Sequence, residues 1–161
     1  MINKRIFSFP PIAATDSRVL ILGTIPGKAS LSKEEYYAHP RNAFWPLMFN
    51  IFEQGFSNNY HDKRRLILER GIALWDVLKG CERDSSLDSD IGMEEPNDFE
   101  AFFKLYPKIE TICFNGQPAF KFFNKYIADC KLDKVILPST SPAHAISIEK
   151  KMERWAIIKT L

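Results

Sequence analysis

The sequence has few cysteines and no metal-binding spacing of cysteine or histidine. Its three cysteines, Cys81, Cys113 and Cys130, include no C-x-x-C pair, which argues against a disulfide framework and a zinc ribbon. Three thiols also cannot supply the four ligands of an iron–sulfur cluster within one chain. The three histidines are scattered, with no H-E-x-x-H or other paired spacing. We therefore expect no structural metal and no cofactor.

Long hydrophobic runs are also missing. No apolar run approaches the about 18 to 20 residues that a membrane-spanning helix needs. Residues 1–9 are charged but are not followed by the apolar stretch that a signal peptide needs. We therefore expect a cytoplasmic protein with no membrane partner.

The 161 residues are 45% hydrophobic and 26% charged, with seven glycines and ten prolines spread along the chain. This composition is typical of a globular protein and excludes disorder, collagen and coiled coil. The length predicts a single domain over residues 1–161.

Charge is unevenly distributed. Residues 82–100 hold eight acidic residues and one basic residue, a net charge of −7, whereas the rest of the chain, with 21 basic and 12 acidic residues, carries +9. This basic remainder predicts either a surface that binds a polyanion or simply scattered, solvated lysines. Charge alone does not choose between them.

Four short, continuous apolar runs predict strands buried on both faces, as in a parallel sheet. They are residues 19–22, 72–75, 111–114 and 135–137. The segments between and after them have the apolar spacing of helices: residues 43–52, 61–70, 99–106, 117–127 and 149–161.

Alternation of strands and helices predicts an α/β fold, in which a mainly parallel four-stranded sheet is covered by helices on both faces. Ligands of such folds bind beyond the carboxyl ends of the strands, so the loops after these four strands are the candidate site. Residues 84–97 have no periodicity and are expected to form a surface loop.

The loop after the first strand, Gly23-Thr24-Ile25-Pro26-Gly27-Lys28, has neither the Walker nor the Rossmann glycine spacing, so nucleotide binding is weakly supported. A tight turn is the simpler interpretation. The segment 36–46 carries tyrosines, a histidine, an arginine and an asparagine ahead of a helix, and their polar ends need partners. Alternatively, Asn42 caps that helix, and the aromatic rings of Phe44 and Trp45 begin its buried face.

The loop after the last strand, residues 137–144, is proline-rich and carries three hydroxyls. Hydroxyls and backbone N–H groups of this kind grip phosphate oxygens of nucleic acids. A capped linker between a strand and a helix is an equally good interpretation.

Five motifs occur in order along most of the chain: G-T-I-P-G (23–27), Y-Y-A-H-P-R-N-A-F-W (36–45), G-I-A-L-W-D (71–76), F-N-G-Q-P-A (114–119) and L-P-S-T-S-P-A-H (137–144). Together they resemble the uracil-DNA glycosylase superfamily. The A-H-P-x-N-x-F-W segment is similar to the mismatch-specific uracil/thymine branch, and the whole combination most resembles the hypoxanthine-DNA glycosylase branch. The resemblance implies a three-layer α/β/α fold.

Two departures from the related motifs matter. In the mismatch-specific branch the first motif carries an asparagine that positions the attacking water, whereas this chain has Ile25, which cannot polarise water. The resemblance to the hypoxanthine branch moves that role to Asn42. Leu137 stands where relatives carry His or Asn, so the resemblance implies that the leaving base is contacted differently.

The resemblance assigns site residues by position. Catalytic roles fall on Asn42, which orients the water, and Asp76, which accepts a base N–H or assists the water. The implied base-binding residues are Tyr37, which stacks on the base, and Thr24, Ile25, Pro26, Gly27 and Asn115. The implied DNA-binding residues are His39, Arg41, Ser139, Thr140, Ser141 and His144. Alternatives stay open for two of them, since Asp76 fits a core salt bridge and His144 a plain surface residue.

The implied activity is hydrolysis of the N-glycosidic bond of a deaminated base, hypoxanthine first, flipped out of DNA. Uracil or mismatch-specific excision is the alternative, as is a DNA-binding module that has lost its chemistry at Ile25. A hydrolase of free nucleotides would need a phosphate loop that is not found. A pair of catalytic carboxylates has less support, because the other acids cluster around Asp88. The implied partner is DNA, and we expect a monomer.

Overall fold

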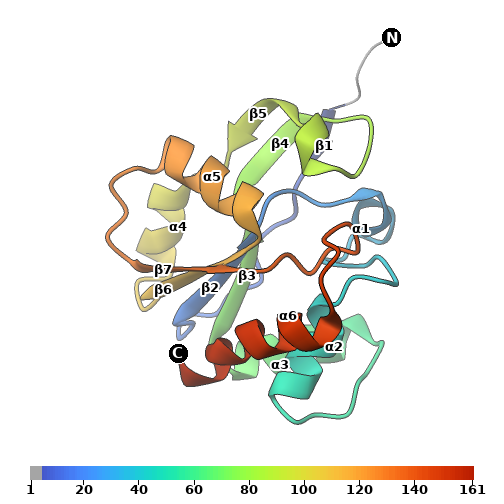
Figure 1. The fold of residues 1–161 in the computed structure, drawn as a ribbon. Coiled ribbons are helices and arrows are strands. Elements are labelled where there is room, and N and C mark those ends of the chain that lie inside the picture. The colour runs from blue at the N-terminus through green and yellow to red at the C-terminus, as the bar shows by residue number, and fades with distance from the viewer. Residues whose placement is uncertain (1–4) are drawn as a thin grey trace.

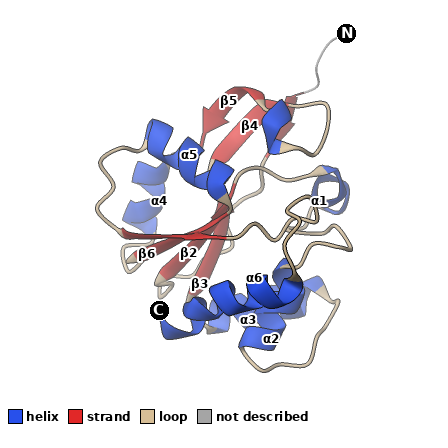
Figure 2. Ribbon diagram, viewed as in Figure 1, coloured by secondary structure: helices blue, strands red, loops and turns tan. Residues whose placement is uncertain are grey.

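The computed structural model describes residues 5–161, and its centre is a parallel sheet of four strands (Figures 1 and 2). The strand order is β3-β2-β6-β7, and all three neighbouring pairs are parallel. The chain moves from β2 to β3 on one side and then crosses to β6 on the other. This confirms the predicted α/β class and sheet. The strands are β2 (Val19–Gly23), β3 (Ile72–Asp76), β6 (Thr111–Asn115) and β7 (Asp133–Leu137).

Helices cover both faces of this sheet, which gives the predicted three layers (Figure 1). One face carries α4 and α5, and the other carries α2, α3 and α6. A short helix that the sequence did not indicate, α1, follows β2. The helices are α1 (Lys28–Lys33), α2 (Phe44–Ile51), α3 (Tyr60–Glu69), α4 (Phe99–Leu105), α5 (Gln117–Tyr126) and α6 (Ile148–Trp155). The predicted last helix ends early, in a 3-10 turn over Ala156–Thr160. No described helix is long and apolar enough to cross a membrane.

Three of the four strands of the sheet, the inner strands β2 and β6 and the edge strand β3, are buried along their whole length. Every residue of β2, β3 and β6 is buried, which is why these strands read as continuous apolar runs rather than alternating ones. The edge strand β7 is exposed at its start and buried only at Leu137. Its first two residues, Asp133 and Lys134, are charged, so the sequence predicted it two residues too short.

The acidic stretch contributes one strand, β5, to a second sheet, so the expected surface loop over residues 84–97 was partly wrong. Three antiparallel strands, β1 (Arg5–Phe7), β4 (Leu78–Glu82) and β5 (Gly92–Pro96), pair in the order β1-β4-β5. Strand β5 has no fully buried residue. Ion pairs hold it instead, from Lys125 to Glu94 and from Arg5 to Glu95, and apolar periodicity cannot reveal a strand of this kind.

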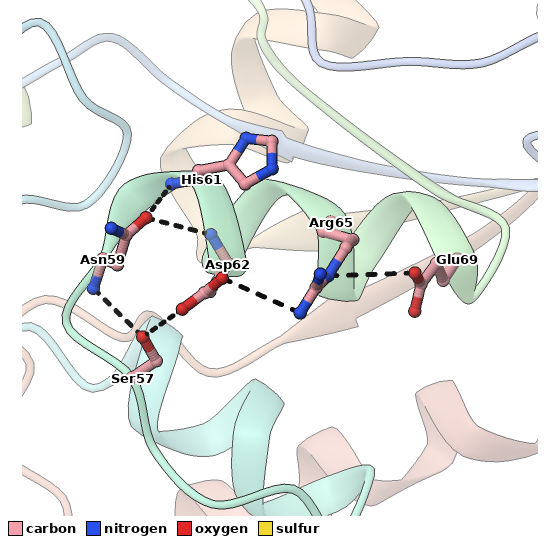
Figure 3. Close-up of polar contacts among 6 residues, drawn as sticks. All are labelled: Ser57, Asn59, His61, Asp62, Arg65 and Glu69. Carbon is pink, nitrogen blue, oxygen red and sulfur yellow. Dashed lines mark hydrogen bonds and ion pairs between the residues drawn. The ribbon is translucent and has the colours of Figure 1, made fainter.

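Helix α3 shows how local side chains set a helix start (Figure 3). The side chain of Asn59 accepts hydrogen bonds from the backbone N–H groups of His61 and Asp62, at 2.8 and 3.3 Å, and so caps two free donors. Ser57 donates to Asp62 at 2.7 Å, and Arg65 pairs with Asp62 one turn on. The exposed His61 therefore belongs to a helix terminus, and it does not line the cavity described below.

We predict that Phe114→Ala lowers the free energy of unfolding by about 3 to 5 kcal/mol, because Phe114 is fully buried on β6 against Phe120 and Phe123 and its truncation leaves a cavity. Urea unfolding of the purified protein measures this. Leu105→Ala, at a side chain that is 67% exposed, is the control and should cost far less. Equal losses would show that the core does not centre on β6.

Candidate active site

A cavity of about 480 Å³ lies beyond the carboxyl ends of the central strands. Strands β2 and β6 are neighbours whose connections leave in opposite directions, and α/β folds bind ligands at such a switch point. The walls come from the loops after β2 and β7 and from the last residues of β3 and β6, Asp76 and Asn115. The lining residues include Gly23, Thr24, Ile25, Pro26, Gly27, Tyr37, His39, Asn42, Asp76, Asn115, Ser139, Thr140, Ser141 and His144. Of the predicted site residues, only Arg41 does not line the cavity; its side chain is exposed nearby.

Gly23 ends β2 at the floor of this cavity, where nothing larger fits. A Cβ atom placed on Gly23 would lie 2.7 Å from Oδ1 of Asp76 and 2.8 Å from the hydroxyl oxygen of Tyr37. Both distances are shorter than a van der Waals contact. The missing side chain therefore lets two polar groups from different segments approach the same point.

Asp76 ends β3 and is only 3% exposed. Its Oδ2 accepts a hydrogen bond from the hydroxyl of Ser8 at 2.7 Å, and among the described residues it forms no salt bridge, so the alternative of a core ion pair does not hold. Burial raises the pKa of Asp76 to about 7, and the negative charge of Asp88 adds to this, whereas Ser8 and Arg83 oppose it. A carboxyl group that titrates near neutrality is poised for proton transfer.

Tyr37 enters the cavity from a strained backbone position, with φ of +55°. Its ring lies against Phe44 with centroids 4.2 Å apart. The hydroxyl oxygen is buried and has no hydrogen-bond partner, a state that costs about 1 to 3 kcal/mol. Burial, and then the negative charge of Asp76, raise the pKa of Tyr37 far above its usual value, so the hydroxyl keeps its proton.

Asn42 both lines the cavity and supports α2. Its Oδ1 accepts a hydrogen bond from the backbone N–H of Phe44 at 2.9 Å, which gives a partner to a free N–H donor at the helix start. A side-chain carbonyl oxygen has two lone pairs, so one remains for another donor. The cap and the site role are thus compatible, because the cap fixes the direction of the amide.

Asn115 and Thr140 join two of the loops by reciprocal hydrogen bonds. The amide of Asn115 donates to Oγ1 of Thr140 and accepts from its backbone N–H, both at 2.9 Å. The carbonyl of Thr140 accepts from the N–H of Ala43 at 3.0 Å. Asn115 therefore lines the cavity with one donor and one acceptor of its amide engaged, and these two bonds hold the loop after β7 beside Asn42.

Helix α6 fixes the same loop from behind. Lys151 is 4% exposed and donates to the carbonyl of Ser141 at 3.1 Å. Trp155 is fully buried and donates from its indole nitrogen to the carbonyl of Pro138 at 2.8 Å. Within the loop, the hydroxyl of Ser139 accepts from the N–H of Ser141, at 3.2 Å. The hydroxyl protons remain available to donate to a ligand.

The rim of the cavity carries the predicted histidines. His39 is exposed, and its Nδ1 accepts from the backbone N–H of Arg41 at 3.1 Å. His144 is exposed on the loop after β7. Within residues 5–161 no group of three or more His, Cys, Asp or Glu side chains is arranged to hold a metal ion.

The acidic stretch also reaches the cavity, which sequence reasoning missed. Asp88 lines it together with Ser86 and Leu87, so the expectation that the acids around Asp88 lie apart from the chemistry was wrong. Buried Arg83 donates to the carbonyl of Pro26, and Ser86 accepts from the N–H of Lys28 at 3.0 Å. Burial raises the pKa of Asp88, while Thr24 and Arg83 lower it. The only feature of the sequence that pointed to this contact was Arg83, the single basic residue of the acidic stretch.

A family model of the uracil DNA glycosylase superfamily matches residues 10–161. The chain belongs to this superfamily.

Two similar proteins and one solved structure accompany this match. The chain is 32% identical over 151 residues to a hypoxanthine DNA glycosylase of Methanosarcina acetivorans, covering 93% of this chain and 95% of that protein. A hypoxanthine DNA glycosylase of Methanosarcina barkeri is 32% identical over 149 residues, covering 92% and 94%. The solution structure of a candidate uracil DNA glycosylase from M. acetivorans superposes with a TM-score of 0.85 at 32% identity, covering 98% of each chain. The superfamily fold thus extends over nearly the whole chain.

We predict that Asp76→Asn stabilises the protein increasingly as pH rises from 5 to 7. The folded chain holds the Asp76 proton up to a pH of about 7, whereas an unfolded aspartate ionises near 3.9. The free energy of unfolding of wild type therefore falls over this window by about 1.4 kcal/mol per pH unit. Asparagine does not ionise, so the variant does not lose this stability.

The measurement is urea unfolding of both proteins at pH 5, 6 and 7. Asp84→Asn, at an exposed acid of the neighbouring loop, is the control and should follow wild type. A constant difference between Asp76→Asn and wild type across the window would contradict a carboxyl with a raised pKa.

Proposed function

We propose that this protein is a DNA glycosylase that removes hypoxanthine, the base of deoxyinosine, from DNA. The observation that carries the proposal is a cavity at the switch point of the sheet, where Asn42 and buried Asp76 both face the same space. The two hypoxanthine DNA glycosylases described above, similar over more than nine-tenths of the chain, support hypoxanthine as the base.

The reaction joins a water molecule to C1′ of the sugar while the bond from C1′ to the base breaks and its electron pair leaves with the base. The sugar becomes positively charged on the way, so the water must be held on the face opposite the base. We assign this to Asn42. Its Oδ1 is fixed by the N–H of Phe44, and its second lone pair accepts a hydrogen bond from the water. The proton that the water loses ends on the departing base, which leaves as a neutral molecule.

Ile25 lines the cavity without a polar atom, so it shapes the pocket and does not orient water. Asn42, on the segment that leads into α2, orients the water instead. A neutral amide is a weak base, so Asp76 supplies the titratable group. With its pKa near 7, it accepts a hydrogen bond from the base as a carboxylate and also exchanges protons near neutral pH.

DNA contacts fall on the rim. Ser139 and Ser141 offer hydroxyl donors on a loop held by α6, and Thr140 holds that loop in register from within. His39, Arg41 and His144 are exposed around the mouth, where they meet phosphates or enter the gap that a flipped base leaves. Tyr37 forms one wall of the base pocket, and its ring is backed by Phe44. We expect the protein to act as a monomer without a cofactor.

We predict that the protein cleaves a duplex containing one deoxyinosine and that Asn42→Ala lowers the single-turnover rate by about 100-fold, the order of the loss when a reacting group is no longer held in position. Labelled oligonucleotides with deoxyinosine, uracil, xanthine or mismatched thymine are incubated with excess protein and developed with alkali. Asn50→Ala, an exposed asparagine of α2, is the matched control and should retain the wild-type rate.

The substrate panel separates the alternatives. Preferred cleavage of uracil or mismatched thymine would show that this base, and not hypoxanthine, is the substrate. Binding of the duplexes without cleavage of any of them would contradict the enzyme and favour a DNA-binding module.

A further inference from the structure

The hydroxyl of Tyr37 is the feature that the assigned roles leave unexplained. In the described part of the chain, the buried side-chain nitrogen and oxygen atoms without a hydrogen-bond partner belong to only two residues, Tyr37 and Arg83. Stacking on a base uses the ring of Tyr37 and would be served equally well by phenylalanine. A buried hydroxyl on a residue that lines the cavity, with no hydrogen-bond partner among the described residues, points to a partner that arrives with the ligand.

The hydroxyl lies beside a free acceptor. Oδ2 of Asp76 is occupied by Ser8, whereas no hydrogen bond reaches Oδ1. Oδ1 and the Tyr37 hydroxyl converge on the same point above Gly23, at 2.7 and 2.8 Å from where its Cβ would stand. The floor of the cavity thus presents one donor and one acceptor side by side.

We propose that the Tyr37 hydroxyl and Oδ1 of Asp76 recognise the lactam edge of the flipped base, in which a ring N–H stands next to a ring carbonyl. The hydroxyl donates to the carbonyl oxygen, and the carboxylate oxygen accepts from the ring N–H. This inference rests on the proposed function and deepens it, because it names the feature of the base that the site recognises.

The pattern matches deaminated bases as a class. Hypoxanthine, uracil and xanthine all present the N–H and C=O pair, which guanine and thymine share, whereas adenine and cytosine present a bare ring nitrogen and an amino group, the reverse arrangement. A site built for the first pattern leaves its own groups unpaired against the second, which rejects the wrong base strongly. Normal adenine would therefore be refused even when it is flipped out.

The surroundings keep the hydroxyl in place. The ring of Tyr37 lies against Phe44, and the preceding residue, Tyr36, is held through its backbone by Tyr60 and Trp45 at 3.0 and 2.7 Å. The group is thus oriented before the base arrives, as recognition in a preformed pocket requires.

The test is Tyr37→Phe, which keeps the ring and removes only the hydroxyl. Duplexes carry deoxyinosine or deoxynebularine, a purine nucleoside that lacks both the carbonyl and the ring N–H. We expect the variant to bind and cleave the deoxyinosine duplex about 10-fold to 100-fold less well than wild type, and to bind the nebularine duplex equally well. The effects of removing the hydroxyl from the protein and the carbonyl from the base would then be non-additive, which shows that the two groups interact.

Thermal unfolding supplies a second readout. Tyr37→Phe should melt at or above the wild-type temperature, because it removes a buried polar group that has no partner. Tyr36→Phe is the comparison. Its hydroxyl donates to the carbonyl of Pro10 at 3.0 Å, so its loss should lower the melting temperature.

Three outcomes would overturn the inference: wild-type behaviour of Tyr37→Phe on both duplexes, an equal loss on both duplexes, or a fall in melting temperature like that of Tyr36→Phe. The first means that the hydroxyl recognises nothing, and the other two mean that it supports the fold. Failure of wild type to cleave any lesion would contradict the proposed function alone, because binding to the two duplexes still tests the hydroxyl.

Discussion

The reciprocal hydrogen bonds between Asn115 and Thr140 are the constraint on which the rest of the site depends. They join the end of β6 to the loop after β7, and the carbonyl of Thr140 continues the connection to Ala43 at the start of α2. Three segments far apart in the sequence are thereby fixed at one edge of the sheet. Because both side chains are buried, neither can exchange these bonds for water without loss. The position of Asn42 relative to the rim follows from this junction.

A second constraint is the absence of a side chain at Gly23. Parallel pairing aligns Gly23 of β2 with Asp76 of β3, and the missing Cβ leaves the space into which Asp76 and Tyr37 both point. The site thus combines loops that are fixed by hydrogen bonds with a few polar groups that those loops leave without a hydrogen-bond partner. Stability and chemistry are supplied by different residues, which is common where a fold carries a preformed pocket.

Much of this organisation could be predicted from the sequence, and the limits have physical causes. The inner strands are buried on both faces, so their apolar runs revealed them, and the switch point of a parallel sheet then indicated which loops to inspect. Strand β5 was missed because ion pairs such as Arg5 to Glu95 stabilise it, and charge leaves no period-2 signal. Ser8 and Asp88 were missed for another reason. Asp88 reaches the cavity, and Ser8 reaches the carboxyl group of Asp76, only because distant segments fold back onto the site, and nothing in their neighbouring residues shows that.

The dependence of the rim on α6 has a consequence for what the end of the chain contributes to the site. Lys151 and Trp155 hold the carbonyls of Ser141 and Pro138, and every other element that lines the cavity precedes α6 in the chain. The four strands of the parallel sheet make no hydrogen bond to these two side chains, so a chain cut before α6 would keep the sequence of its sheet and lose both anchors of its rim. The last helix of the chain thus serves the geometry of the pocket through the two carbonyls that it holds.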